Sequence, residues 1–280
     1  MERFKHHKTI IWGIEESCNK LPRARTPHFK KIGELIAEVD NHNHPIVQSF
    51  VVENDPEGDF PAGGVTSDDY VGDPHIRLVT WLHLVPHGKD FEQQHREYLN
   101  YAERDIDRFV VLKNETFHHP LREASSRIYM WSCAMTGMHA LEAYHHADST
   151  SHETLADDGR IRAFMEQTDF HQMRPNDALA AGSTNWVLGN PGQSYIAYTY
   201  AYEGHMGLKN LEAGSYDLLW FDAVDGDEVF QMELGPTGQA RIPDNELDAD
   251  NKRKLLVDGE NSLYRELDRA RVSIEEWHRD

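Results

Sequence analysis

Short apolar runs recur at a regular interval through the first 150 residues of the chain. Four runs stand out, at residues 9–14, 45–52, 76–85 and 108–112. Their starts lie roughly 30 to 37 residues apart, which is the length of a βαβ unit. Continuous runs rich in Val and Ile are typical of strands buried on both faces of a parallel sheet. The pattern therefore predicts four parallel strands.

Segments with helical periodicity lie between these runs. Residues 28–39 carry apolar side chains at helical spacing, and residues 91–106 are polar but compatible with a helix. After the fourth run, three- and four-residue steps predict an amphipathic helix through Ile128, Trp131, Met135, Met138 and Leu141. Alternation of strand and helix favours an α/β architecture with a parallel sheet.

The pattern changes near residue 155. One more helix is expected at residues 161–173, followed by four β-type runs at 184–188, 194–202, 215–223 and 227–234. Turns that contain glycine separate these runs, and Asp225-Gly226 is the clearest hairpin signal. Antiparallel strands joined by tight turns predict a small β-sandwich. The charged tail beyond residue 244 is expected to be helical at residues 255–277.

Composition and charge restrict the class of protein. The 280 residues are 39% hydrophobic and 10% aromatic, which is typical of a globular chain. Forty-eight acidic against 28 basic residues give a formal net charge of −20, which argues against nucleic acid or an anionic membrane as partner. No run is long enough for a membrane span, and the start lacks the apolar region of a signal peptide. A cytoplasmic location is the default expectation, and the mature form of a secreted protein stays open as the alternative.

Cysteine and histidine give no metal or cofactor motif. Only Cys18 and Cys133 are present, so no disulfide framework or CxxC site is expected. Many of the 18 histidines occur in adjacent pairs, whose side chains point apart on a strand or helix, and HExxH is absent. We expect no metal and no cofactor.

Two of the predicted parallel strands end in acidic residues. Glu15 and Glu16 follow the first run, and Glu115 follows the fourth. The carboxyl ends of parallel strands form the active-site face of (β/α) barrels. Glycosidic bond cleavage needs two carboxyl groups, one on each side of the bond. An acid at a strand end is also a common helix cap or solvated loop residue, so this alternative stays open.

Three segments resemble retaining (β/α)-barrel glycoside hydrolases of the apiosidase-like type. Residues 12–19, WGIEESCN, resemble strand four of that group, which ends in the acid/base glutamate. Residues 109–117, FVVLKNETF, resemble strand seven, which ends in the nucleophile. Residues 126–144, SRIYMWSCAMTGMHALEAY, resemble the strand-eight and helix-eight region.

A second resemblance covers residues 161–233. FMEQTDFHQMRPNDAL and the later YDLLWFDAVDGDEV resemble a collagen-binding-like β-sandwich that commonly follows such barrels. Together the resemblances imply an α/β plus β protein: a partial TIM-type (β/α)8 barrel with strands four to eight, then a small antiparallel β-sandwich. The implied domains are a barrel at 1–160, the sandwich at 161–240 and a charged helical tail at 241–280.

The resemblance also implies roles for single residues. Glu16 is expected to be the acid/base, with Glu15 as its competitor, and Glu115 the nucleophile. A carbohydrate is the expected substrate. The candidates for sugar contact are Trp12, His75, Trp81, Asn114 and Trp131. Aromatic faces and polar side chains suit this task, but core packing is the more common role of a tryptophan in such a position.

The chain begins at what resembles strand four, so the counterparts of strands one to three are missing. Such a remnant leaves open sheet edges, which proteins normally cover or pair. Three explanations are considered: a truncated gene product, a genuine half-barrel, and a partner chain that completes the barrel. The alternative functions are a non-catalytic carbohydrate- or collagen-binding accessory protein and an inactive hydrolase remnant.

Overall fold

The chain divides into two compact units. The computed structural model describes residues 6–51, 63–82, 90–114, 123–139, 150–200, 206–212 and 216–234. Unit 1 comprises Met1–Lys89, Arg96–His119 and Met138–Tyr144, and unit 2 comprises Asp90–His95, Pro120–Gly137 and His145–Asp280. The domain boundaries expected at residues 160 and 240 stay a prediction, and the tail helix expected at 255–277 lies outside the described residues.

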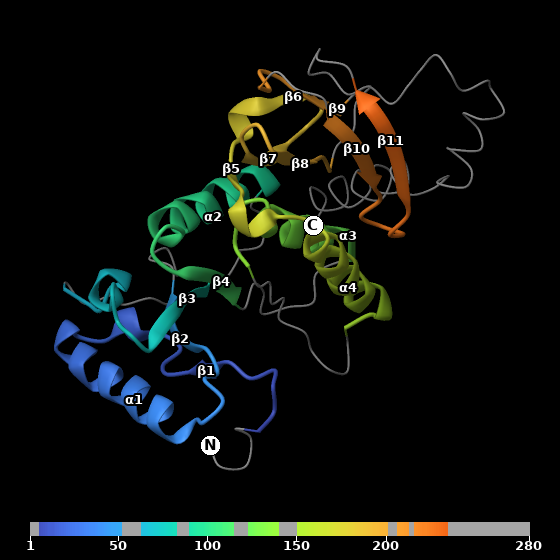
Figure 1. The fold of residues 1–280 in the computed structure, drawn as a ribbon. Coiled ribbons are helices and arrows are strands. Elements are labelled where there is room, and N and C mark those ends of the chain that lie inside the picture. The colour runs from blue at the N-terminus through green and yellow to red at the C-terminus, as the bar shows by residue number, and fades with distance from the viewer. Residues whose placement is uncertain are drawn as a thin grey trace, which may run out of the picture. The chain divides into compact units, whose positions relative to one another are not determined.

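Unit 1 contains a four-stranded parallel sheet. Its strands are β1 (Trp12–Gly13), β2 (Ile46–Val51), β3 (Ile76–Leu82) and β4 (Val110–Asn114), in the spatial order β1-β2-β3-β4 (Figure 1). All three strand pairs are parallel. The prediction of four parallel strands is confirmed, although β1 is much shorter than its apolar run.

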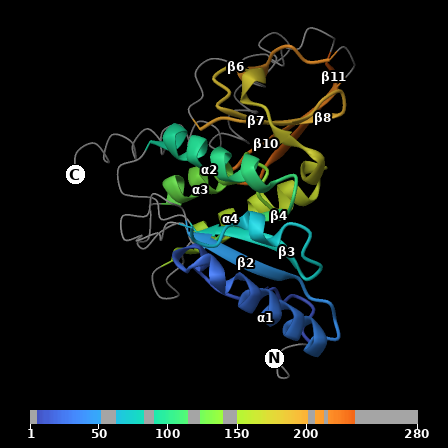
Figure 2. The same ribbon diagram turned by 90° about the vertical axis from the view of Figure 1, so that its left-hand side faces the viewer.

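Two helices connect strands of this sheet. Helix α1 (Thr26–Val39) follows β1, and α2 (Phe91–Asp105) follows β3 (Figure 2). A Cβ on Gly33 of α1 would lie 3.2 Å from Ile76 and 3.5 Å from Ile14, so α1 packs closely on the sheet at a position free of a side chain. Both helices agree with prediction. Leu35 and Val39 of the predicted apolar stripe are nevertheless 47% and 39% exposed.

An aromatic cluster fills the space between the sheet and α2. Phe50 of β2 pairs in register with Trp81 of β3, so both side chains point to one face, and their rings lie 5.2 Å apart. Tyr70 and Tyr101 pack against this pair, the first from the short helix η3 (Ser67–Tyr70) and the second from α2. Phe50, Tyr70 and Trp81 are at most 2% exposed, so this face forms the core of unit 1.

Unit 2 contains helices α3 (Glu123–Ala134) and α4 (His152–Glu166). Arg127 of α3 donates to the Asp157 carboxylate of α4 at 2.7 Å, and both side chains are 1% exposed. Burial raises the pKa of Asp157 to about 6, against the lowering effect of Arg127 and Arg160. Helix α3 ends earlier than the pattern predicts, because Gly137 adopts a left-handed φ of 81° three residues later. Helix α4 begins nine residues before the start predicted for it.

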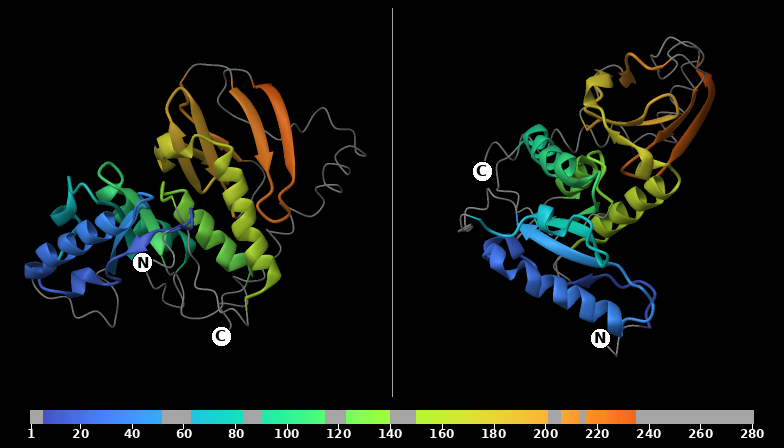
Figure 3. Two further views of the ribbon diagram at one scale, coloured as in Figure 1. Left: turned by 60° about the horizontal axis from the view of Figure 1, so that its bottom comes forward. Right: turned by 60° about the vertical axis from the view of Figure 1, so that its left-hand side comes forward.

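The described part of unit 2 also contains three small antiparallel sheets (Figure 3). The first joins β5 (Arg174–Pro175), β7 (Trp186–Asn190) and β8 (Ser194–Tyr198). The second pairs β6 (Ala180–Gly182) with β9 (Met206–Leu208). The third pairs β10 (Tyr216–Phe221) with β11 (Glu228–Leu234). The four longer strands were predicted, whereas β5, β6 and β9 were not.

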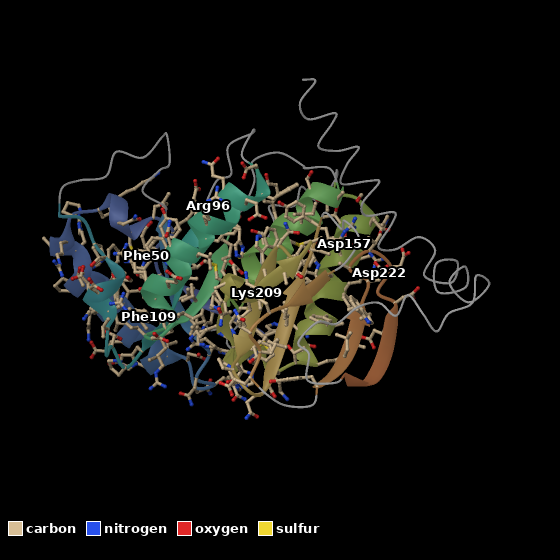
Figure 4. The ribbon with its side chains drawn as sticks, turned by 90° about the horizontal axis from the view of Figure 1, so that it is seen from above. Phe50, Arg96, Phe109, Asp157, Lys209 and Asp222 are labelled. Atoms are coloured by element: carbon tan, nitrogen blue, oxygen red, sulfur yellow. The ribbon has the colours of Figure 1, made fainter. Side chains whose placement is uncertain are left out.

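The β10–β11 hairpin confirms the signal at Asp225-Gly226, but its loop is longer than two residues. Asp222 Oδ1 accepts the backbone N–H groups of Val224 at 2.7 Å and Asp225 at 3.2 Å. Gly226 adopts a φ of 81° and donates its N–H to the Asp222 carbonyl at 2.8 Å. A Cβ on Gly226 would lie 3.6 Å from Arg160 of α4, and Figure 4 labels Asp222 of the hairpin loop and Asp157 of α4. The parallel sheet of unit 1 and the antiparallel sheets of unit 2 together make the protein α/β plus β.

Candidate functional site

The carboxyl end of β1 is held against β2 by backbone and side-chain contacts of Glu15. The Glu15 carbonyl accepts the Ser49 N–H at 3.2 Å and the Gln48 side-chain amide at 3.0 Å. Its carboxylate accepts the backbone N–H groups of Glu16 at 3.1 Å and Ser17 at 3.4 Å. The Glu15 carboxylate therefore closes a local turn.

The Glu16 carboxylate takes no part in the turn that Glu15 closes. Its side chain is exposed, and no described residue pairs with it. Of the two adjacent acids at this strand end, Glu16 is therefore the one whose carboxylate does not bond to the turn.

An amide clamp fixes the segment that follows Glu16. Asn19, in the short helix η1 (Cys18–Lys20), donates its side-chain N–H to the Val51 carbonyl at 2.6 Å and accepts the Val51 N–H at 2.9 Å. These two bonds imitate a strand pair at the carboxyl end of β2. The position of Glu16 is thus set by backbone structure on both sides of it in sequence.

Cys18 is not a nucleophile in this setting. Its thiol is fully buried, and burial raises its pKa far above the ordinary value, although a hydrogen bond from Gln48 works in the opposite direction. A thiol that keeps its proton and has no access to solvent is unreactive.

The second predicted carboxylate, Glu115, follows directly after the described part of β4. Asn114 is the last residue of β4 and pairs in register with Leu82 of β3. Glu115 comes directly after it and lies outside the described residues. Because all four strands are parallel, the ends of β1 and β4 lie at the same edge of the sheet.

The strand order sets the separation of those two ends. Strands β1 and β4 are the outer strands, with β2 and β3 between them. Neighbouring strands lie about 4.8 Å apart, so a flat sheet would separate β1 from β4 by about 14 Å. A retaining pair of carboxyl groups needs about 5 to 5.5 Å. A shared site at Glu16 and Glu115 therefore requires the sheet to curve and both side chains to incline toward each other.

Trp81 occupies the core of unit 1. It is 2% exposed, with ring centroids of Phe50 and Tyr101 at 5.2 and 4.8 Å. Its indole N–H donates to Asp105 at 3.0 Å, and Asp105 also accepts from Ser67 at 2.8 Å. These contacts give Trp81 a packing role and leave its sugar-binding role without support.

Trp12 and His75 lie toward the starts of their strands, away from the edge that carries the strand ends. Trp12 begins β1 and donates its indole N–H to Asp40, the residue after α1, at 3.3 Å. His75 directly precedes β3, and its backbone N–H donates to Asp73 at 2.9 Å. A strand of seven residues is about 20 Å long, so the structure does not bring His75 to the edge that carries the strand ends.

Trp131, in unit 2, is also enclosed. It is 3% exposed and stacks on Tyr198 at 4.9 Å, with the Phe164 ring at 5.4 Å. The sugar contact predicted for it therefore finds no support in the observed packing.

Unit 2 contains a buried polar network that the sequence did not reveal. His95, which is 1% exposed, faces the Ser132 carbonyl at 2.8 Å through Nδ1 and the Asp177 carboxylate at 3.1 Å through Nε2. Its ring stacks on Trp186 at 4.6 Å. Both ring nitrogens therefore face hydrogen-bond partners, and the network ties α2 to α3 and to the segment before β7 within unit 2.

The Glu92 carboxylate extends this network. It accepts hydrogen bonds from the Asn185 amide at 3.1 Å, the Tyr200 hydroxyl at 2.9 Å and the Trp186 indole at 3.4 Å. The partners are more than ninety residues apart in sequence from Glu92, so no local pattern could predict the cluster.

Neither a metal site nor a membrane span is found in the part of the chain that the structure describes. No group of three or more His, Cys, Asp or Glu side chains there is arranged to hold a metal ion. No described helix has the length and apolar character needed to cross a membrane. Comparison with protein-family models and with curated proteins gives no match to this chain.

Proposed function

We propose that the chain is a retaining glycoside hydrolase that acts on an oligosaccharide or polysaccharide. The observation that supports this most directly is the consecutive parallel order β1-β2-β3-β4, with Glu16 following β1 and Glu115 following β4 at one edge. In this proposal the parallel sheet is the strand-four to strand-seven part of a (β/α)8 barrel, and the antiparallel sheets of unit 2 form a β-sandwich.

The path of the chain after α3 is consistent with a further strand. The His139 N–H donates to the Val111 carbonyl of β4 at 2.9 Å, so the chain returns to β4 after the helix. A strand eight in this position would continue the order of the sheet. The outer edge of β1 would then receive the remaining strands, and a partner chain is one source of them.

The proposed reaction uses two carboxyl groups in turn. The Glu115 carboxylate attacks the anomeric carbon while the Glu16 carboxyl group donates its proton to the departing glycosidic oxygen, and the carbon–oxygen bond breaks. The Glu16 carboxylate then takes a proton from water, whose oxygen attacks the same carbon and releases Glu115. Both groups end in their starting protonation states.

Hydrolysis by single-residue variants tests the proposal. Wild-type protein is assayed against a panel of plant-type oligosaccharides and aryl glycosides, together with Glu115→Gln and Glu16→Gln. Each variant is expected to lose at least about 100-fold in kcat/KM, because each removes a group that acts in the transition state.

Glu15→Gln is the matched control, since a glutamine side-chain oxygen still accepts the turn N–H groups of Glu16 and Ser17. It is expected to keep activity within a few-fold of the wild type. Unchanged turnover in Glu115→Gln would reject the assignment, and no hydrolysis of any substrate by the wild type would favour an inactive remnant.

A non-catalytic carbohydrate- or collagen-binding protein is the second candidate. The enclosed positions of Trp81 and Trp131 favour it, because an active cleft needs sugar-facing walls that these residues do not supply. Binding of glycan or collagen that survives the double change Glu16→Gln and Glu115→Gln, with no hydrolysis by the wild type, would select this candidate.

A further inference from the structure

Two tyrosines form a fixed aromatic corner on unit 2. Tyr195 of β8 and Tyr216 of β10 are half-buried, and their rings meet edge to face at 5.9 Å with an interplanar angle of 66°. The Gly192 N–H donates to the Tyr195 hydroxyl at 2.9 Å, and the Tyr216 hydroxyl donates to the Glu212 carbonyl at 3.0 Å. Hydrogen bonds at both ring tips hold the corner in one conformation.

Two glycines make room for this arrangement. Gly189 of β7 pairs in register with Tyr195, and a Cβ on Gly189 would lie 2.9 Å from the Tyr195 ring. The ring therefore lies directly on the backbone of β7, which a larger residue at 189 would prevent. Gly192, with a φ of 75°, lets Glu212 approach, since a Cβ there would lie 2.5 Å from the Glu212 carboxylate.

The surroundings of the corner determine which ligand suits it. Glu212 is exposed beside the corner, with its carboxylate close to Gly192 and its carbonyl bonded to Tyr216, and its carboxylate supplies acceptors of hydrogen bonds. A partly exposed aromatic face beside such groups matches a sugar ring, which has an apolar face and a rim of hydroxyl groups. The Glu212 carboxylate and the net charge of −20 disfavour an acidic sugar.

Partial burial raises the pKa of the Tyr216 hydroxyl, and the neighbouring Tyr195 hydroxyl and Glu212 carboxylate raise it further. The hydroxyl therefore keeps its proton at neutral pH and donates it to the Glu212 carbonyl. The corner therefore presents a protonated Tyr216 side chain beside the Glu212 carboxylate.

We propose that the Tyr195–Tyr216 corner is a binding site for a neutral saccharide, with the sugar ring stacked on Tyr195 and its hydroxyl groups bonded to the Glu212 carboxylate. The site lies wholly within unit 2 and is separate from the proposed hydrolytic pair. It gives the second, non-catalytic candidate function a location, and it also suits a hydrolase that holds its substrate at two places.

Affinity electrophoresis of the full chain in gels with soluble neutral polysaccharides (xylan, galactomannan, mixed-linkage glucan) tests the proposal. At least one of these is expected to retard the wild type, whereas polygalacturonate, which is acidic, is not. Tyr195→Ala is expected to weaken retardation about tenfold, because it removes the stacking face. Tyr195→Phe keeps that face and is expected to stay within about threefold of the wild type.

Leu155→Ala is the surface control, since Leu155 is 50% exposed on α4, and it should leave retardation unchanged. The double variant Glu16→Gln and Glu115→Gln should also bind normally, which separates this proposal from the hydrolytic one.

Thermal melts show whether each variant is folded. Should a variant unfold, protection of Tyr195 and Tyr216 from nitration by added polysaccharide serves as the second readout on the wild type. No retardation by any neutral polysaccharide, or equal retardation of folded Tyr195→Ala, overturns the proposal.

Discussion

At the scale of single residues, the two neighbouring acids that follow β1 have different surroundings. The Glu15 carboxylate accepts the backbone N–H groups of Glu16 and Ser17 and so closes a turn, whereas the Glu16 side chain is exposed. Trp81 and Trp131 were both expected to contact a sugar, but aromatic neighbours enclose each of these side chains.

Asp222 is expected to make the protein less stable as pH rises, because its carboxyl group is buried. One oxygen accepts two turn N–H groups, but the other is buried without a partner among the residues that the structure describes. Burial raises the pKa of Asp222, and the carboxylates of Asp225 and Asp227 add to this effect. A folded-state pKa above the unfolded value means that the stabilising contribution is present at low pH and is lost as pH rises.

Asp222→Asn keeps an oxygen for the turn and removes the charge. The unfolding free energy of Asp222→Asn minus that of the wild type is therefore expected to increase as pH rises from about 4 to 7. Urea denaturation across this range measures it. Asp222→Ala, which loses the acceptor, should be less stable by about 1 to 2 kcal/mol. A difference for Asp222→Asn that stays constant or falls with pH contradicts this account.

At the scale of elements, long periodic segments were predictable and short paired ones were not. Helix α1 and strands β2, β3 and β4 lie where the apolar pattern places them, because each contributes buried apolar side chains to unit 1. Strands β5, β6 and β9 contain only two or three residues and exist through pairing with distant partners. The Tyr195–Tyr216 corner was missed for the same reason, although Gly189 opposite Tyr195 becomes informative once the register is known.

Two glycines provide a matched test of backbone conformation. Gly159 lies inside α4, where an added Cβ would meet nothing within 4 Å, whereas Gly226 has a left-handed φ of 81°. Gly159→Ala is expected to stabilise the protein by about 0.5 to 1 kcal/mol, since alanine has the higher helix propensity. Gly226→Ala should destabilise it by about 1 to 2 kcal/mol. Thermal and urea unfolding report both, and the same sign for the two variants would refute the assignment.

The clamp between η1 and β2 is expected to be a stabilising contact. Asn19→Ala leaves the buried N–H and C=O groups of Val51 without their side-chain partner, so a loss of about 2 to 3 kcal/mol is expected. Asn100→Ala on the exposed surface of α2 is the control and should change stability by less than about 0.5 kcal/mol. Equal effects in urea denaturation would show that the clamp adds little.

At the scale of the whole molecule, the α/β plus β class was predictable because strand and helix periodicity alternate early and only strand signals follow. Whether the parallel sheet curves into a barrel was not, since curvature depends on contacts between strands rather than on any one segment. The distance between the two candidate carboxyl groups could not be predicted for the same reason. Glu16 and Glu115 can be placed at one sheet edge from sequence, but their separation depends on the curvature of the sheet.

The central claim is that these two carboxyl groups share one site, and a crystal structure that measures the distance between them tests it most directly. A retaining hydrolase predicts about 5 to 5.5 Å between the carboxyl groups of Glu16 and Glu115. A separation near the roughly 14 Å of a flat sheet, with the side chains in different environments, would contradict the claim.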